Sequence, residues 1–121
     1  MKNERSLPRA FGHALNGIIQ FTRQERNGKI QLVIAACTML AAFFFSVSSF
    51  EWIALLLCIG GVLSLEMLNS AIEKLGDFVH DTYHPGIKII KDVAAAAVLF
   101  FSFISAIIGI IIFFPRIIQL F

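Results

Sequence analysis

The sequence has few charged side chains and lacks the motifs of the common soluble nucleotide-binding folds. Charged residues make up 15% of its 121 residues and hydrophobic residues 58%, and the mean hydropathy is +0.82. A small soluble domain usually has an apolar share nearer half, so a membrane protein is the first interpretation to test. Neither GxxxxGK[ST] nor GxGxxG occurs, which excludes a P-loop and a Rossmann nucleotide site.

The two cysteines, Cys37 and Cys58, have neither CxxC spacing nor a Cys/His pattern. Both lie in apolar runs, where a cysteine serves as a small buried hydrophobe. A secretory signal peptide is not expected, because the first apolar run starts near residue 30 and exceeds the roughly 7 to 15 residues of a signal-peptide core. We expect this run to remain as a membrane anchor.

Three apolar runs are long enough to cross a bilayer, which takes about 20 predominantly apolar residues. They predict transmembrane helices over residues 30–50, 52–78 and 88–115. Pro85 and Gly86 should separate the last two. Ahead of them, apolar residues at helical spacing predict an amphipathic surface helix over residues 8–26. The expected fold is therefore an all-α integral membrane protein, with residues 1–121 in a single domain.

Basic residues are unevenly spread between the predicted spans. Six precede the first span, and three lie on either side of the break between the second and third: Lys2, Arg5, Arg9, Arg23, Arg26 and Lys29, then Lys74, Lys88 and Lys91. None lies between the first two spans. The positive-inside rule then places the N-terminus and the second loop in the cytoplasm and the C-terminus outside, with Arg116 as a mild exception.

One polar column interrupts the second span. Its members, which fall within roughly 80° of one another on a helix, are Glu66, Asn69, Glu73 and Asp77. His80 joins them if the helix continues that far. A carboxylate in the apolar region costs at least a few kcal/mol unless it is paired, hydrated or protonated, so Glu66 is a functional-site candidate. The alternative is a solvated helix end, with Glu66 bonded internally for packing.

Two further polar patches lie at the same predicted interface. KIIKD supplies Lys88, Lys91 and Asp92, and RQERNGK supplies Glu25 where the surface helix meets the first span. Carboxylates without clustered His or Cys favour a hard ion such as Mg²⁺, and neighbouring lysines favour a phosphate ligand. A carboxylate just below the membrane surface could take a proton from a lipid hydroxyl. Together these groups suggest hydroxyl-to-phosphate chemistry.

The pair His80 and His84 has the i, i+4 spacing of a zinc site, with Asp77 and Asp81 nearby. A third nitrogen or sulfur ligand is lacking, so zinc is the weaker interpretation. The polar column alone also leaves open a small proton or cation transporter, although the outer half of the second span, WIALLLCIGG, is apolar. A structural membrane subunit is the remaining alternative.

The motifs EMLNSAIE (66–73), Asp77, YH (83–84) and KDVAAAAV (91–98) resemble the bacterial membrane diacylglycerol kinase family over almost the whole chain. HALNG, RQERN, EW, GG and HP are more similar to the undecaprenol kinases within it. The resemblance implies a homotrimeric helical bundle in the bacterial inner membrane, with active sites between subunits. It further implies an ATP-dependent lipid kinase that uses Mg²⁺, has no nucleic-acid partner and phosphorylates undecaprenol, or alternatively diacylglycerol.

The resemblance also implies roles for individual residues. Glu66 would be the general base, Glu25 and Glu73 would bind magnesium, and Arg9 and Glu66 would contact the lipid. The other catalytic candidates are Asn69, Lys91 and Asp92. The candidate ATP-binding residues are His13, Glu25, Glu73, Asp77, Tyr83, His84, Lys91 and Asp92. Two positions depart from the close pattern: Gln31 replaces a common histidine and Asn16 a common basic residue, and neither is expected to touch the core motif.

Overall fold

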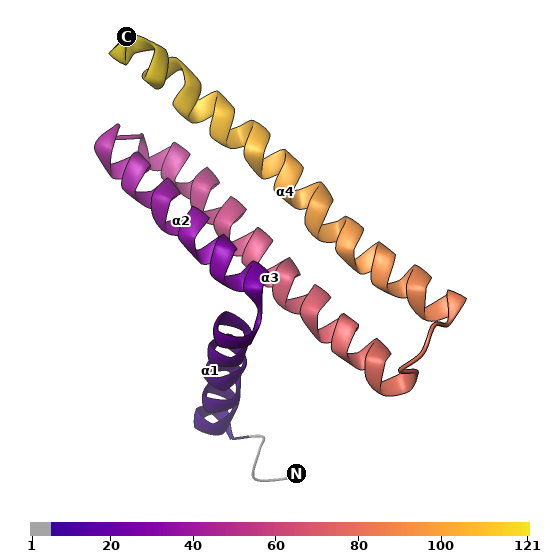
Figure 1. The fold of residues 1–121 in the computed structure, drawn as a ribbon. Helices are drawn as coiled ribbons and strands as arrows, with labels where there is room; N and C mark the ends of the chain where they lie inside the picture. Colours follow the sequence, from indigo (N-terminus) through magenta and orange to yellow (C-terminus); the bar gives the residue numbers. More distant parts are fainter. Residues whose placement is uncertain (1–5) are drawn as a thin grey trace.

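The computed structural model describes residues 6–121, which form four α-helices and no strand. These are α1 (Leu7–Gln24), α2 (Arg26–Phe44), α3 (Ser49–Val79) and α4 (Pro85–Leu120). The last three are long and apolar enough to cross a membrane, which agrees with the three predicted spans. Neighbouring long helices run antiparallel: α2 and α4 both lie along α3, while α1 turns away from the start of α2 (Figure 1).

The turn between α2 and α3 lies inside the first predicted span, so the bounds 30–50 were wrong. Helix α2 begins earlier, at Arg26, and ends at Phe44. Ser48 starts α3 through a capping box: its side chain accepts a hydrogen bond from the Glu51 backbone at 3.1 Å, and the Glu51 carboxylate accepts one from the Ser48 backbone at 2.9 Å. Ser46 has φ 52°, the left-handed conformation that reverses the chain.

A single residue, Glu25, separates α1 from α2. Its extended backbone, with φ −100° and ψ 122°, ends α1 two residues before the predicted bound of 26. Phe21 is buried against α2 at this junction. A Cβ on Gly28 would lie 2.8 Å from the Phe21 ring, so the close approach of the two helices requires a glycine there.

The linker between α3 and α4 spans residues 80–84. Helix α3 ends at Val79, and His80 has an extended backbone, so His80 does not continue the polar column. His84 caps α4, because its Nδ1 accepts a hydrogen bond from the Gly86 backbone at 3.0 Å, and Pro85 occupies the first helical position. Helix α4 is longer at both ends than the predicted 88–115.

The end of the bundle near the α2–α3 turn, here called the hairpin end, holds a cluster of buried apolar residues. Its buried residues are Ala42, Val47, Leu55 and Ile112, with Phe45, Trp52 and Phe113 packed around them. Arg116 of α4 donates two hydrogen bonds to Glu51 of α3, at 2.7 and 2.9 Å. The basic residue that ran against the positive-inside pattern is therefore neutralised by a bidentate carboxylate partner.

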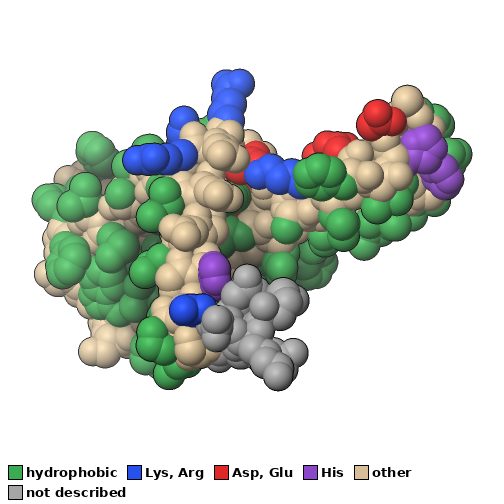
Figure 2. Space-filling view, turned by 90° about the horizontal axis from the view of Figure 1, so that it is seen from below, with side chains coloured by type: hydrophobic (Ala, Val, Ile, Leu, Met, Phe, Trp, Pro, Cys, Tyr) green, Lys and Arg blue, Asp and Glu red, His purple; other side chains and the backbone are tan. Residues whose placement is uncertain are grey.

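Most apolar side chains remain on the surface. The chain exposes 9093 Å², whereas a compact soluble monomer of this mass would expose roughly 6,500 Å². Figure 2 shows hydrophobic side chains spread widely over the face in view, with the charged side chains confined to part of it. Such a surface suits contact with lipid or with other subunits.

Candidate active site

The polar column lies on one unbroken helix, because α3 runs continuously from Ser49 to Val79. Glu66 is only 7% exposed and is the one buried charged side chain among the described residues. Glu73 and Asp77, further along the same helix, are exposed. Asn69 Oδ1 is buried and makes no hydrogen bond within residues 6–121. The column therefore passes from a desolvated carboxylate to accessible ones.

Gln31 of α2 interacts with the side chain of Glu66. It also lines a cavity together with Val62 and Leu63, which lie one turn before Glu66 on α3. The expectation that Gln31 stays clear of the core motif was therefore wrong. The sequence spacing gave no sign of this contact, because it depends on how α2 packs against α3.

This cavity has a volume of about 340 Å³ and lies between α2, α3 and α4; its lining reaches the neighbours of Glu66 but does not include Glu66 itself. Most of its lining is apolar, and its few polar side chains are Gln31, Thr38, Ser102 and Ser105. The Ser105 hydroxyl oxygen is buried without a hydrogen-bond partner in the described chain. The lining extends from Gln31, near Glu66, to Phe113 at the hairpin end, which gives a long apolar slot.

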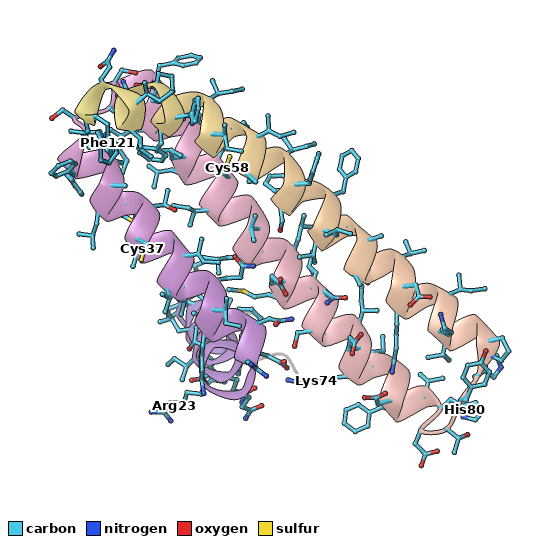
Figure 3. All side chains as sticks on the ribbon, turned by 45° about the horizontal axis from the view of Figure 1, so that its top comes forward. Arg23, Cys37, Cys58, Lys74, His80 and Phe121 are labelled. Carbon is cyan, nitrogen blue, oxygen red and sulfur yellow. The ribbon has the colours of Figure 1, made fainter. Side chains whose placement is uncertain are left out.

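Glu25 at the α1–α2 junction is bound by two residues of α3. The Ser70 hydroxyl donates to Glu25 Oε1 at 2.7 Å, and Lys74 Nζ lies 3.2 Å from the same oxygen. Figure 3 shows Lys74 on α3 beside this junction. The Ser70 hydrogen bond, and then Lys74, hold the pKa of Glu25 below its usual range. Glu25 therefore stays ionised beside the column.

Two ion pairs order the region around the α3–α4 linker, here called the linker end. Lys91 of α4 pairs with Asp77 of α3, and Lys88 pairs with Asp92 at 2.6 Å. Lys91 reaches Asp77 by passing over Gly76, where a Cβ would lie 2.9 Å from Lys91 Cε. Glu73 is also close enough to interact electrostatically with Lys91. Carboxylates and ammonium groups from two helices thus share one surface.

Other predicted site residues lie apart from this cluster. Arg9 and His13 line a shallow hollow on α1 with Gly12 and Asn16, and no hydrogen bond or ion pair within residues 6–121 joins them to the column. Tyr83 is 75% exposed in the linker. Figure 3 places His80 at the linker end, far from Phe121 at the hairpin end.

The histidine pair gives no support to a zinc site. The rings of His80 and His84 are 5.1 Å apart, but each Nδ1 already has a hydrogen-bond partner, Thr82 for His80 and Gly86 for His84. In the described part of the chain, no group of three or more His, Cys, Asp or Glu side chains is arranged to hold a metal. Individual carboxylates are therefore the remaining candidate metal ligands in this part of the chain.

Comparison with known proteins assigns this chain to a family. Residues 12–113 match the family described as prokaryotic diacylglycerol kinase. The chain belongs to this family. As a prokaryotic diacylglycerol kinase family member it is a lipid kinase, which confirms the activity expected from the EMLNSAIE and KDVAAAAV motifs.

The relatives of this prokaryotic diacylglycerol kinase family member carry two substrate names. It is 43% identical over 108 residues to the undecaprenol kinase of Bacillus subtilis, an alignment that covers 89% of this chain and 88% of the relative. It is 30% identical over 112 residues to a Synechocystis diacylglycerol kinase, covering 92% of this chain and 64% of the relative. A Helicobacter pylori diacylglycerol kinase is 42% identical over 78 residues, which cover 62% and 59% of the two chains.

Proposed function

We propose that this lipid kinase transfers the γ-phosphate of ATP to undecaprenol and forms undecaprenyl phosphate. The observation that carries the proposal is Glu66, a carboxylate buried in an apolar helix one turn beyond the lining of a slot of about 340 Å³ that could take an apolar chain. The similarity to an undecaprenol kinase over 88% of that protein favours a polyprenol as acceptor. Diacylglycerol, named in the other relatives, is the alternative acceptor.

Glu66 is the general base of the proposed reaction. Its carboxylate takes the proton of the lipid hydroxyl, and the hydroxyl oxygen forms a bond to the γ-phosphorus. The bond from that phosphorus to the oxygen bridging the β- and γ-phosphates breaks, so ADP leaves with the electron pair and the proton stays on Glu66. Phosphoryl transfer depends mainly on positioning and charge neutralisation, which a small helical bundle can supply.

Glu25 and Glu73 are the residues we assign to magnesium. Glu73 lies on α3 and Glu25 is bonded to α3 through Ser70, and Glu25 Oε2 accepts no hydrogen bond within residues 6–121, so these oxygen donors suit a hard cation. When bound, Mg²⁺ neutralises phosphate charge. Lys91 and Asp92 contact the phosphates, with Asn69 and Asp77 supporting them, while His13, Tyr83 and His84 line the nucleotide and Arg9 meets the lipid headgroup.

The assembly and orientation complete the proposal. The protein forms homotrimers in the bacterial inner membrane, with active sites between subunits and α1 lying as an amphipathic helix on the cytoplasmic surface. The extensive exposed apolar area supports a lipid and subunit environment, and the basic residues support a cytoplasmic N-terminus and linker with the C-terminus outside. Two of those residues, Lys2 and Arg5, lie outside the described residues.

The test of the lipid acceptor is a direct product comparison. Purified protein in detergent is incubated with labelled ATP, magnesium and either undecaprenol or diacylglycerol. Labelled undecaprenyl phosphate, formed faster than phosphatidic acid at equal lipid mole fraction, is the expected result. Faster labelling of diacylglycerol would assign the alternative acceptor, and labelling of neither would contradict both.

An ion path remains the alternative from another class. It would need polar groups along the hairpin end of α3, where the buried side chains are Leu55 and its apolar neighbours Ala42, Val47 and Ile112. Measurement of proton and cation flux in proteoliposomes without ATP checks this point, and we expect no flux above that of empty liposomes.

A further inference from the structure

Both donors to Glu25 bind the same carboxylate oxygen. Ser70 Oγ lies 2.7 Å from Oε1 and Lys74 Nζ lies 3.2 Å from it. Among residues 6–121, no hydrogen bond reaches Oε2. The carboxylate is therefore held in one orientation while its second oxygen keeps all its lone pairs for another ligand.

Ser70 is the better placed of the two donors. It lies on α3 four residues after Glu66 and three before Glu73, so its hydroxyl stands on the same helix face as both carboxylates. Its hydrogen bond is part-buried, whereas the Lys74 side chain is 52% exposed and its charge is partly screened by solvent. The short, part-buried, charge-assisted bond should therefore contribute more to the orientation of Glu25.

The direction of the Ser70 hydroxyl is also informative. A serine inside a helix commonly bonds back to a carbonyl one turn earlier, as Thr38 does with Ile34 at 2.8 Å in this chain. Ser70 instead reaches a residue 45 positions away in the sequence, on a different helix junction. Its hydroxyl thus links the α1–α2 junction to the polar column rather than satisfying its own helix.

We propose that Ser70 is a positioning residue for the metal side of the active site, because it fixes Glu25 Oε1 and so presents Oε2 to the divalent cation that accompanies ATP. The inference rests on the proposed assignment of Glu25 to magnesium. A polar group that orients a metal ligand typically changes metal affinity by about 10- to 100-fold when it is removed. The role therefore has a consequence for metal binding that is separate from turnover.

The experiment measures Mn²⁺ binding to the full-length protein in detergent. Free Mn²⁺ is quantified by electron paramagnetic resonance in the presence of a non-hydrolysable ATP analogue. We expect Ser70→Ala to weaken Mn²⁺ binding by about tenfold, and Ser70→Thr, which keeps the hydroxyl, to remain within about twofold of the wild type. Lys74→Met should weaken binding less than Ser70→Ala, because its bond is longer and more exposed.

Steady-state kinetics supply the second readout. With Ser70→Ala, the magnesium concentration for half-maximal rate should rise by about tenfold, while the KM for the lipid should stay at the wild-type value. The rate at saturating magnesium should largely recover. An equal loss at every magnesium concentration, or a raised lipid KM, would contradict a role confined to the metal side.

The variants also separate this inference from the proposal on which it rests. If Glu25→Gln binds Mn²⁺ as the wild type does, the magnesium assignment itself is wrong. If Glu25→Gln weakens binding but Ser70→Ala does not, Glu25 keeps its role and the inference about Ser70 fails. A lower unfolding temperature for Ser70→Ala at unchanged Mn²⁺ affinity would mean that Ser70 only stabilises the fold, and this result would also overturn the inference about Ser70.

Discussion

The two ends of the α3–α4 pair are built from the same helices but in opposite ways. At the hairpin end, the buried residues are apolar and the ion pair Glu51–Arg116 is bidentate and half-buried. At the linker end, Gly76 is the buried residue on α3, and single ion pairs join Lys91 to Asp77 and Lys88 to Asp92. The Lys88–Asp92 pair is exposed on both sides, whereas in the other pair Asp77 is exposed and the Lys91 side chain is 27% exposed. Glu66 lies between the two environments.

The hairpin end of α3 thus contributes to stability, whereas its linker end presents charged groups for chemistry. A bidentate, part-buried pair over an apolar core fixes one end of the bundle, because few other arrangements satisfy both guanidinium donors. Exposed single ion pairs contribute little to stability and exchange readily with other charged ligands. The linker end can therefore release the exposed Lys88 to a phosphate without loss of the fold, while the hairpin end keeps the helices in register.

The largest expected effect is the loss of turnover in Glu66→Gln. The amide cannot accept the proton of the lipid hydroxyl, and general-base catalysis contributes about 10²- to 10⁴-fold to a rate. Lipid phosphorylation in a labelled-ATP assay should fall by at least about 100-fold, while ATP-analogue binding and the oligomer size in detergent stay as in the wild type. Full activity of this variant would remove Glu66 from the mechanism.

A smaller effect on turnover is expected from Gln31→Leu. The substitution removes the polar neighbour of Glu66, and the loss of about 1.4 kcal/mol of transition-state stabilisation would lower kcat by about tenfold. Thr38→Val is the matched control, because Thr38 lines the same cavity from α2 without contacting Glu66 and bonds only to its own helix. Equal losses in both variants would mean that cavity shape matters rather than the contact with Glu66.

A substitution at the hairpin end should instead lower the stability of the protein. Arg116→Met breaks both bonds to Glu51, and we expect the thermal unfolding midpoint in detergent to fall by about 5 °C. Turnover per folded molecule should stay unchanged. Glu51→Gln and the double variant complete a cycle, in which the two losses should not add. A large drop in kcat without a change in stability would reverse the proposed division of the molecule.

The smallest effect is a pH dependence of stability that comes from Glu25. Its lowered pKa in the folded state means that its bonds to Ser70 and Lys74 stabilise the fold above the unfolded value of about 4.3, and that this contribution is lost as the pH falls through the folded pKa. The difference in unfolding midpoint between wild type and Glu25→Gln should therefore shrink from pH 6 to about pH 3. A difference that is constant with pH would contradict the pairing.

The sequence was sufficient for the three spans and for Glu66, because hydropathy and the cost of a buried carboxylate are local properties. The helix ends were harder to predict from the sequence. Phe45 and Val47 continue the apolar pattern through a turn that is set by the Ser48–Glu51 capping box and by Ser46 in a left-handed conformation. Hydropathy averages over such a turn and does not detect it.

The contacts around the candidate site depend on packing between helices, which spacing on one helix does not encode. Gln31 was expected to lie away from the motif, yet α2 brings it to Glu66. Ser70 lies inside the EMLNSAIE motif but received no role, because its partner Glu25 is 45 residues away. The only sign of a role for Ser70 in the sequence was its place within a run of candidate site residues. Serine is common in membrane helices for packing alone, so this sign was weak.

The break between α1 and α2 is one residue long, and that residue is Glu25 itself. A loop of several residues would let α1 tilt freely while leaving its neighbours in place. Here any change in the angle of α1 must rotate the backbone that carries the Glu25 carboxylate, with the Phe21 ring pressed on Gly28 opposing it. The tilt of the first helix is thus coupled to the orientation of the carboxylate that we propose to bind magnesium.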